Sequence, residues 1–591
     1  MIHRTVHPVR ALVSAVRFPL IACMLLAVSC HAQSPMEDRV DSVRNFFAGP
    51  KTSADVYGAL ERTFRDSLRG QGCRILHEMF QSEPSDIVAR FRLALAYLFA
   101  RDRLPDSTQA AYRRLWASVP LLPMQSEHQR VAAAAAHLLA AEGLGPAAAW
   151  YNGLTTEENR RSAASELDEW IRTTAAFGQQ DFDSPTYGPL FFTAMLAIDR
   201  FSSDRSLGDR ARVMATWLLA DYFHEYIGGQ FGGAHGRENM YSAMQPLSSD
   251  LSTLAWLYFG DGVQSYSREQ YIATLFDYRP PKAVMHLALG KKQPFTAVEV
   301  KRSADRIRRD TVRTRSVVKS TYIAPPYMVG HVDGGLLQPR EQHTWDVTWW
   351  CDTGSTTLFT MHPYSEAAPL TEFHPHDAAT AYRIVASEDP YYGTTTKTVG
   401  GSPFEYIFQH KNTVIALYDI PDIKRFPFIC GFLPLHVDAF DIDSLRTGWI
   451  TIKAGDVYLA YYPLRPGRLT NEQFGRRIFS RYRRNGAVVQ VASRAETGSY
   501  ASFRTRILRT VPDTSAFFTK GLVAYRTIFG DRLEARIGKS LRVNGIAQKR
   551  SLDMLFDSPW LSSRRGSGVL TITTPGERLV IDIPRAEIRH G

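Results

Sequence analysis

The sequence predicts an α+β protein in which an N-terminal (α/α) toroid is followed by a large antiparallel β-sandwich. Apolar residues recur at helical spacing from about residue 37 to residue 277, with high alanine and leucine content. Alternating and β-branched segments follow the Tyr278–Pro281 stretch. The chain of 591 residues is also too long for one hydrophobic core. We therefore expect two large units in this order.

The change in sequence pattern near residue 280 sets the expected domain boundaries. Residues 1–32 form a signal peptide, and residues 33–280 form the helical toroid, which we expect to carry the catalytic site. Residues 281–510 form the β-sandwich, and residues 511–591 form a C-terminal sheet that extends it.

The first 32 residues have the form of a secretory signal peptide. Their basic region contains Arg4, Arg10 and Arg17. The apolar run 18–28 is too short to cross a bilayer comfortably, and small residues allow cleavage after Ala32. We expect an exported protein, either periplasmic or extracellular.

Cys30 supports a second interpretation of the same segment. The sequence Leu-Ala-Val-Ser-Cys before and at Cys30 is similar to a lipoprotein signal, although Ala27 stands where a larger aliphatic residue is usual. A lipid on Cys30 would tether the chain to the outer membrane. Both interpretations place the mature protein outside the cytoplasm.

The composition restricts the class of partner. Hydrophobic residues make up 44% of the chain, which is typical of a globular protein. The formal net charge of +11 favours a polyanionic partner. Because the chain is exported and carries no nucleic-acid-binding motif, we expect an acidic polysaccharide and no nucleic acid.

Three cysteines remain outside the predicted signal peptide: Cys73, Cys351 and Cys430. Three widely spaced cysteines do not make a disulfide framework or a zinc ribbon. Cys351 and Cys430 could form a disulfide, and buried free thiols are the alternative.

Helical segments fill the first half of the mature chain, and we expect no strand there. Clear examples are Val56–Phe64, Ile87–Phe99 and Val131–Ala141. Prolines and glycines separate about ten such segments. Antiparallel helical hairpins in that number form either an α-solenoid or a closed toroid. The absence of a fixed sequence repeat favours the toroid.

The segment Phe231–Tyr241 is the best candidate for a functional site in the helical half. Glycines at 228, 229, 232 and 233 would let the chain approach a ligand closely. The segment then supplies an imidazole, a guanidinium, a carboxylate, an amide and a phenol. The alternative interpretation is a solvated loop whose polar residues cap the flanking helices.

Four segments carry a resemblance to a known group of enzymes: Asp181–Tyr187, Gly232–Tyr241, Ser402–Tyr418 and Gly448–Tyr458. Together with the order of toroid and sandwich, they resemble the polysaccharide lyases of the chondroitin/hyaluronate, alginate and heparinase II/III type. The domain order covers nearly the whole mature chain. No segment matches the catalytic signature of one lyase family.

The resemblance implies cleavage of a uronic-acid polymer by β-elimination. The enzyme must neutralise the uronate carboxylate, remove the proton from C5 and protonate the leaving oxygen. Tyr241 is then the acid and also a candidate base, and His235 is the base or a carboxylate partner. Arg237 and Asn239 would bind and neutralise the carboxylate. No cofactor is required.

Further residues are candidates for substrate binding. They are Tyr187, Glu238, Trp150, Tyr151 and His410. Ser184 is a plausible helix cap before Tyr187, and Trp150 and Tyr151 are expected at a helix start. A packed core tyrosine is the alternative for Tyr187.

The β half contains a weak metal motif at His374, His376 and Asp377. On a strand, His-x-His places both rings on one face, which would suit a structural Zn²⁺ or Ca²⁺. The alternative is a loop of exposed histidines beside a proline.

Two other functions fit parts of the same sequence. A glycoside hydrolase on the toroid would need two carboxylates that flank the scissile bond. The candidates for these carboxylates are Asp181, Asp183, Glu225 and Glu238. The other alternative is a non-catalytic glycan-binding surface protein.

Overall fold

A computed structural model describes residues 35–591 apart from 83, 85, 121–125, 304–305, 308–315, 338–341, 351–355, 363–400, 423–426, 444–446 and 473–474. The predicted signal peptide with Cys30, the metal candidates His374, His376 and Asp377, and Cys351 lie outside the described residues. Within the described ranges, none of the helices combines the length and apolar character that a membrane crossing needs.

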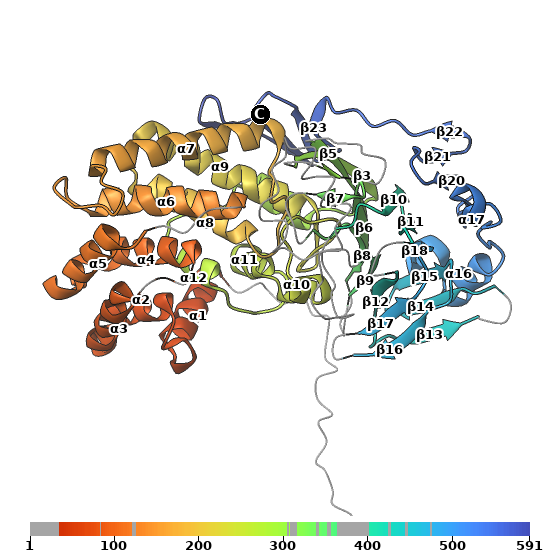
Figure 1. Cartoon of the computed structure of the whole chain (residues 1–591), viewed down its shortest axis with the longest axis horizontal. Coiled ribbons are helices and arrows are strands. Elements are labelled where there is room, and N and C mark those ends of the chain that lie inside the picture. Colours follow the sequence, from red (N-terminus) through yellow and green to blue (C-terminus); the bar gives the residue numbers. More distant parts are fainter. Residues whose placement is uncertain are drawn as a thin grey trace, which may run out of the picture.

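Helices dominate the chain up to Leu289 (Figure 1). They are α1 (Met36–Ala48), α2 (Val56–Phe64), α3 (Arg69–Gln81), α4 (Ile87–Ala100), α5 (Asp106–Ser118), α6 (Glu127–Gly143), α7 (Thr156–Phe177), α8 (Gly188–Phe201), α9 (Arg205–His224), α10 (Met240–Met244), α11 (Asp250–Phe259), α12 (Arg268–Ala273) and α13 (Lys282–Leu289). Short 3₁₀ turns lie at Pro50–Thr52, Asp66–Leu68, Arg101–Arg103 and Pro246–Ser248.

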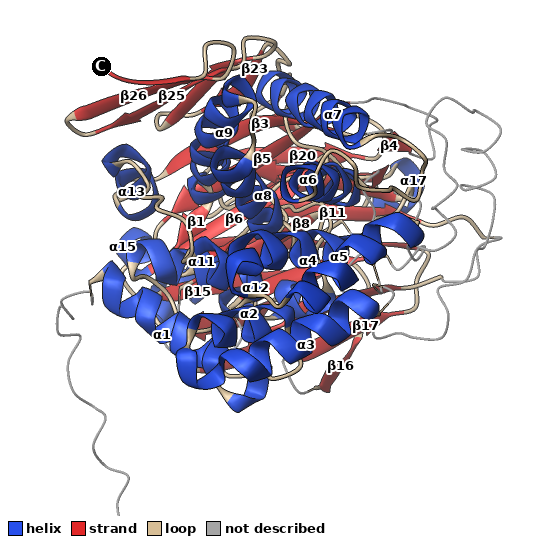
Figure 2. Ribbon diagram, turned by 90° about the vertical axis from the view of Figure 1, so that its left-hand side faces the viewer, coloured by secondary structure: helices blue, strands red, loops and turns tan. Residues whose placement is uncertain are grey.

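The helices close on themselves in a ring. Helices α2, α4, α6 and α8 contact one another in succession, and α1 contacts α11 and α12. At this closure, Nε of the buried Arg39 donates a hydrogen bond to the carbonyl oxygen of Leu257 at 2.8 Å. Figure 2 looks onto this half, with helices in front of the strands.

Local sequence explains helix α6, which lies between α4, α7 and α8. Ser126 and Gln129 form a capping box that satisfies two backbone N–H groups at its start. The alanines of the run 132–136 are buried, and their small side chains let neighbouring helices pack closely.

The helical half also contains a short hairpin that the sequence did not predict. Strands β1 (Tyr226–Ile227) and β2 (Gln230–Phe231) pair antiparallel across Gly228 and Gly229. Both glycines have positive φ, +52° and +86°, so they supply a turn that other residues adopt at an energetic cost. The expectation of no strand in this half is therefore wrong.

Antiparallel strands dominate the chain from Phe295 onward. Those before residue 494 are β3 (Phe295–Arg302), β4 (Arg306–Ile307), β5 (Ser316–Ala324), β6 (Tyr327–Val332), β7 (Leu336–Leu337), β8 (Trp345–Trp349), β9 (Thr357–Met361), β10 (Glu405–His410), β11 (Thr413–Asp419), β12 (Ile429–Leu433), β13 (Ala439–Ile442), β14 (Ile450–Ala454), β15 (Val457–Pro463), β16 (Arg468–Asn471), β17 (Arg476–Ser480) and β18 (Arg484–Ser493).

Two described sheets form a sandwich. One has 13 strands in the order β16-β17-β12-β9-β8-β6-β5-β3-β23-β24-β25-β26-β27, and the other has six in the order β10-β11-β18-β15-β14-β13. Their facing side chains, such as Trp345, Val347, Val414 and Leu459, are buried in one hydrophobic cluster. Burial on facing sides of two sheets is the arrangement that a β-sandwich requires.

The residues after 493 complete the 13-stranded sheet and add a smaller sheet of their own. They contain α15 (Arg494–Thr497), α16 (Tyr500–Ile507), α17 (Phe517–Lys520), β19 (Leu522–Arg526), β20 (Arg532–Arg536), β21 (Arg542–Val543), β22 (Ile546–Ala547), β23 (Met554–Asp557), β24 (Leu561–Arg564), β25 (Val569–Thr574), β26 (Glu577–Asp582) and β27 (Glu587–His590). Strands β19–β22 form a separate sheet, which packs with α16 and α17 on the outer face of the six-stranded sheet.

Strands β23–β27 instead pack against the helical half. Phe556 of β23 pairs with Glu299 of β3, which joins these strands to the 13-stranded sheet. Leu570, Ile572 and Leu579 belong to the same buried cluster as the helices. The predicted class, a helical region followed by large antiparallel sheets, is confirmed.

Candidate functional site

Two loops meet where the ring of helices faces the sheet. The first, residues 178–187, links α7 to α8, and the second, residues 225–239, links α9 to α10. We call them the loop pair. Three hydrogen bonds join them: Gly236 N to Phe182 O at 2.8 Å, Ser184 Oγ to Arg237 O at 2.8 Å, and Asn239 Nδ2 to Thr186 Oγ1 at 2.9 Å.

The backbone of the loop pair is strained in both loops. Asp183 has φ of +47° and Arg237 has φ of +60°, in the left-handed region that non-glycine residues rarely adopt. Such a conformation costs on the order of 1–3 kcal/mol and persists only where surrounding contacts enforce it. Strain of this kind is concentrated at functional sites, and it occurs here on both sides of one junction.

The glycines of the second loop face the sheet. Gly233 N donates to Asp346 Oδ1 at 2.7 Å, and a Cβ on Gly232 would lie 2.8 Å from the side chains of Met328 and Thr348. His235 and His343 exchange backbone hydrogen bonds at 2.9 and 2.8 Å. The glycines therefore permit close contact between backbone and sheet, where the sequence had suggested close approach to a ligand.

His235 is part of this contact with the sheet. Its side chain is buried, with 2% of the residue exposed. Burial, reinforced by the charge of Lys319, holds the pKa of the imidazole well below its usual range, so the ring is neutral at pH 7. Glu238 is buried as well, and burial raises the pKa of its carboxyl to about 8.

The remaining predicted residues of this loop are more accessible. Tyr241, in the first turn of α10, is 49% exposed. The Arg237 side chain retains 12% exposure, and its Nε lies 3.7 Å from Asp181 Oδ1. Asn239 Oδ1 accepts a hydrogen bond from Ser242 N at 2.8 Å, so Asn239 caps α10 while it binds the other loop.

The first loop contributes Tyr187 on a buried support that sequence reasoning missed. The Tyr187 ring stacks on the His128 ring with centroids 3.7 Å apart. His128 Nδ1 lies 2.8 Å from Asp181 Oδ2, and the backbone N–H of His128 donates to the same oxygen at 3.0 Å. Ser184 Oγ accepts from Tyr187 N at 3.0 Å in the turn before α8. The N-cap of α8 is Tyr187 itself and has no side-chain cap hydrogen bond, so the prediction that Ser184 caps this helix is wrong. The only sequence signal for His128 is its place in the first turn of a capped helix.

Asp181 links this support to the second loop. Burial pushes the pKa of its carboxyl upward, but the His128 hydrogen bond and the charges of His128 and Arg237 outweigh burial and lower it. An ionised Asp181 therefore holds the imidazole on one oxygen and attracts the guanidinium with the other.

Two buried lysines of the sheet hold the floor of the loop pair. Lys301 Nζ lies 2.9 Å from Asp183 Oδ1, 2.8 Å from Asp221 Oδ1 and 2.9 Å from Glu299 Oε2. Lys319 forms ion pairs with Asp183 and Glu225. Buried charges are tolerated only when they are paired in this way.

The same cluster has the spacing of a metal site but not its chemistry. Oxygens of Asp183, Asp221 and Glu299 lie within 4.8 Å of one another. The Lys301 ammonium is bound to all three carboxylates and supplies the positive charge that a cation would bring. These residues therefore do not fit a metal ion.

The other predicted binding residues lie away from the loop pair. Trp150 is buried, donates from Nε1 to Thr156 Oγ1 at 3.0 Å, and lies in the loop before α7, so the expected helix start is wrong. The Tyr151 hydroxyl lies 3.3 Å from His137 Nε2. His410, in β10, pairs with Asp531 at 3.0 Å. Cys73 and Cys430 are buried free thiols.

Comparisons with known proteins find little. No protein-family model matches the chain, and no curated protein matches it in sequence. Among solved structures, the crystal structure of heparinase III is similar, with a TM-score of 0.41 and 7% identity over 86% of this chain and 82% of that chain. A superposition this loose equates no particular residue of the two proteins.

Proposed function

We propose that this protein is an exported lyase that cleaves a uronic-acid-containing polysaccharide by β-elimination at the loop pair. The proposal depends on which side chains at the loop pair are exposed and which are buried. Phenol, guanidinium and amide groups remain accessible at the junction, whereas the neighbouring carboxylates are buried beneath it. This is the set that binds an anionic sugar and moves a proton without a carboxylate acid–base pair.

Arg237 and Asn239 are the groups proposed to neutralise the uronate carboxylate. A guanidinium forms charge-assisted hydrogen bonds with a carboxylate, and an amide N–H adds another donor. Neutralisation makes the C5 proton more acidic, which is the main difficulty of the reaction. Asp181 would orient the guanidinium, because it is fixed by two hydrogen bonds from His128.

Tyr241 is proposed as the acid and also the base. It is the most exposed proton-transfer group of the loop pair region, so it can reach a polymer. Tyr187 is a second phenol at the junction, positioned by its stack on His128. The burial of His235 and Glu238 favours a positioning role for both, since neither reaches solvent appreciably.

The burial of the carboxylates also separates this proposal from glycoside hydrolysis. A hydrolase needs two carboxyl groups that flank the bond, roughly 5–10 Å apart, in contact with the sugar. Asp181, Asp183, Glu225 and Glu238 are each at most 6% exposed. Asp183 and Glu225 are in addition engaged by the buried lysines.

The N-terminal segment and the net charge of the chain also support the proposal. The basic and apolar N-terminal segment supports secretion to the periplasm or beyond, with a lipid on Cys30 as the alternative to cleavage after Ala32. A net charge of +11 suits an acidic polymer. The proposed chemistry requires no cofactor, since protein groups neutralise the carboxylate.

The test is a substrate screen with the mature protein. Alginate, hyaluronate, chondroitin, heparan and ulvan are incubated separately, and ultraviolet absorbance reports the C4–C5 double bond that elimination creates. We expect absorbance with at least one polymer, and its loss in Tyr241→Phe. Tyr482→Phe is the matched control, because Tyr482 is another exposed tyrosine (40%) in the β half.

Two other outcomes would contradict the proposal. New reducing ends without ultraviolet absorbance would indicate hydrolysis. Binding of a polymer that survives in Tyr241→Phe, with no turnover by any variant, would indicate a glycan-binding protein.

A further inference from the structure

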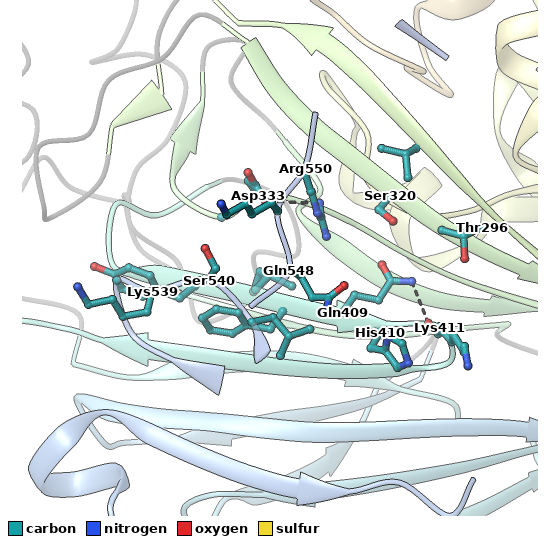
Figure 3. A pocket seen from close by; sticks show the side chains of 18 residues that line it. Thr296, Ser320, Asp333, Gln409, His410, Lys411, Lys539, Ser540, Gln548 and Arg550 are labelled. Carbon is teal, nitrogen blue, oxygen red and sulfur yellow. Dashed lines mark hydrogen bonds and ion pairs between the residues drawn. The ribbon is translucent and has the colours of Figure 1, made fainter. Parts of the chain in front are cut away.

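A cleft lies between the two sheets of the sandwich and the C-terminal segment (Figure 3). Its volume is about 840 Å³, within the range of roughly 300–1,000 Å³ typical of ligand sites. Strands β3 and β5 form one wall, β10 with Lys411 forms a second, and residues 538–541 with 548–550 form the third.

The cleft and the loop pair lie on opposite faces of the 13-stranded sheet. Successive residues of a strand point to opposite faces. In β3, Glu299 and Lys301 point to the helices, where Lys301 meets Asp183 and Asp221, whereas Thr296 and Val298 line the cleft. The sheet therefore separates the two sites.

The lining of the cleft is basic. It contains Lys411, Lys539, Lys549 and Arg550, with Asp333 as its acidic residue. Arg550 Nη1 lies 3.5 Å from Asp333 Oδ1, and Lys411 lies 3.4 Å from Asp531 behind it. For Lys539 and Lys549, no ion pair exists within the described part of the chain. Two ammonium groups therefore remain available to an anion.

Arg550 is held by a buried hydrogen-bond chain. Gln409 Nε2 donates to Val329 O at 2.6 Å and to Lys411 O at 3.0 Å, which leaves Gln409 Oε1 as an acceptor. His331 Nδ1, 2.5 Å from that oxygen, must then donate, so Nε2 accepts from Arg550 Nη2 at 2.9 Å. His331 is 1% exposed. A buried neutral histidine thus orients a guanidinium at the cleft without cancelling its charge.

We propose that this cleft binds a carboxylate-bearing oligosaccharide as a second, non-catalytic site. Lys539, Lys549 and the oriented Arg550 match the carboxylates of such a ligand. Amides and hydroxyls of the lining, including those of Gln548 and Ser540, match its sugar hydroxyls. The inference does not depend on the lyase reaction, because the cleft and the loop pair share no residue.

The test measures binding by isothermal titration calorimetry on the full mature chain. The probe is an unsulfated hyaluronan hexasaccharide, with cellohexaose as the neutral counterpart and inorganic sulfate as the simple anion. All titrations use the Arg237→Ala background, which weakens binding at the loop pair. The variant under test is Lys539→Glu/Lys549→Glu, and Lys51→Glu/Lys282→Glu is its control, since both pairs are exposed lysines.

We expect the hexasaccharide to bind and the Lys539→Glu/Lys549→Glu variant to weaken it at least about tenfold, because charge-assisted hydrogen bonds are lost. The control variant should bind as the Arg237→Ala protein does, and Gln548→Ala should weaken binding without a change of charge. Equal affinity in the test and control variants would overturn the proposal. The proposal would also be overturned if cellohexaose bound as tightly as the hexasaccharide. It would be overturned as well if sulfate displaced the hexasaccharide completely at the sulfate concentrations that its own dissociation constant predicts.

Discussion

Glu238→Gln gives the sharpest test of the electrostatics at the loop pair. Burial raises the pKa of the Glu238 carboxyl from an ordinary value of 4.5 to about 8. The folded protein thus holds this proton more tightly than the unfolded chain does. Between pH 4.5 and pH 8 the folded state binds more protons, so stability contributed by this group falls as the pH rises.

The size of the effect follows from the two pKa values. A difference between 4.5 and about 8 corresponds to roughly 5 kcal/mol once the pH exceeds both. Glutamine cannot ionise, so Glu238→Gln escapes this penalty. Relative to the wild type, the variant should gain stability progressively from pH 5 to pH 9.

The assay is urea denaturation followed by tryptophan fluorescence at a series of pH values. The difference in unfolding free energy between Glu238→Gln and wild type is plotted against pH. Glu78→Gln is the control, because Glu78 is exposed on α3. A difference that stays constant from pH 5 to pH 9, or one that favours the wild type at high pH, would refute the assignment of a buried protonated carboxyl.

Three further predictions concern the same region. Lys319→Met should destabilise the fold by about 3–5 kcal/mol, because Asp183 and Glu225 lose the buried cation that pairs with them. The double variant Lys319→Met/Glu225→Gln should recover part of that stability, and chemical denaturation measures both effects. Gly233→Ala should destabilise the fold more than Gly530→Ala does, and thermal melts should show the difference. Both glycines have φ above +90°, so the backbone strain is similar. A Cβ at position 233 would lie 2.9 Å from a side-chain oxygen, whereas a Cβ at position 530 would contact nothing within 4 Å. Dialysis against EDTA should leave ultraviolet-detected turnover unchanged, and a loss restored by Ca²⁺ or Zn²⁺ would contradict the proposal that Arg237 and Asn239 suffice.

The pattern of apolar residues predicted the helical and β regions, because burial of helices and strands in a core imposes that pattern. The stretch 131–141 consists almost wholly of valine, alanine and leucine, which is typical of a buried helix, and the run 413–418 has the β-branched character of a buried strand. Sequence spacing alone cannot reveal which strands pair across a long gap. The pairing of Phe556 with Glu299 joins residues more than 250 positions apart, and no local pattern marks it.

Strand β3 shows why the site was harder to predict than the fold. Glu299 and Lys301 alternate with apolar residues and look like the solvent-facing side of a strand. In the structure they are buried, because Lys301 meets carboxylates from α9 and from the first loop. His128 and Asp181 are 53 positions apart, so their contact was equally invisible. The sequence did bring Arg237, Asn239 and Tyr241 together, since they are neighbours in the chain at the end of the second loop and the start of α10.

The continuous 13-stranded sheet constrains how the molecule can move. Strands β3 and β23 are neighbours in one hydrogen-bonded ladder, yet β23–β27 lie on the helices while β5 and β6 belong to the sandwich. Strands β23–β27 thus connect the ring of helices to the sandwich, because they pack on the helices and pair with β3. Swinging the two halves apart as rigid bodies would tear this ladder and uncover Lys301 and Lys319. If the proposed lyase function holds, a polymer would have to bind without separation of the two halves, so any adjustment would be confined to loops and side chains.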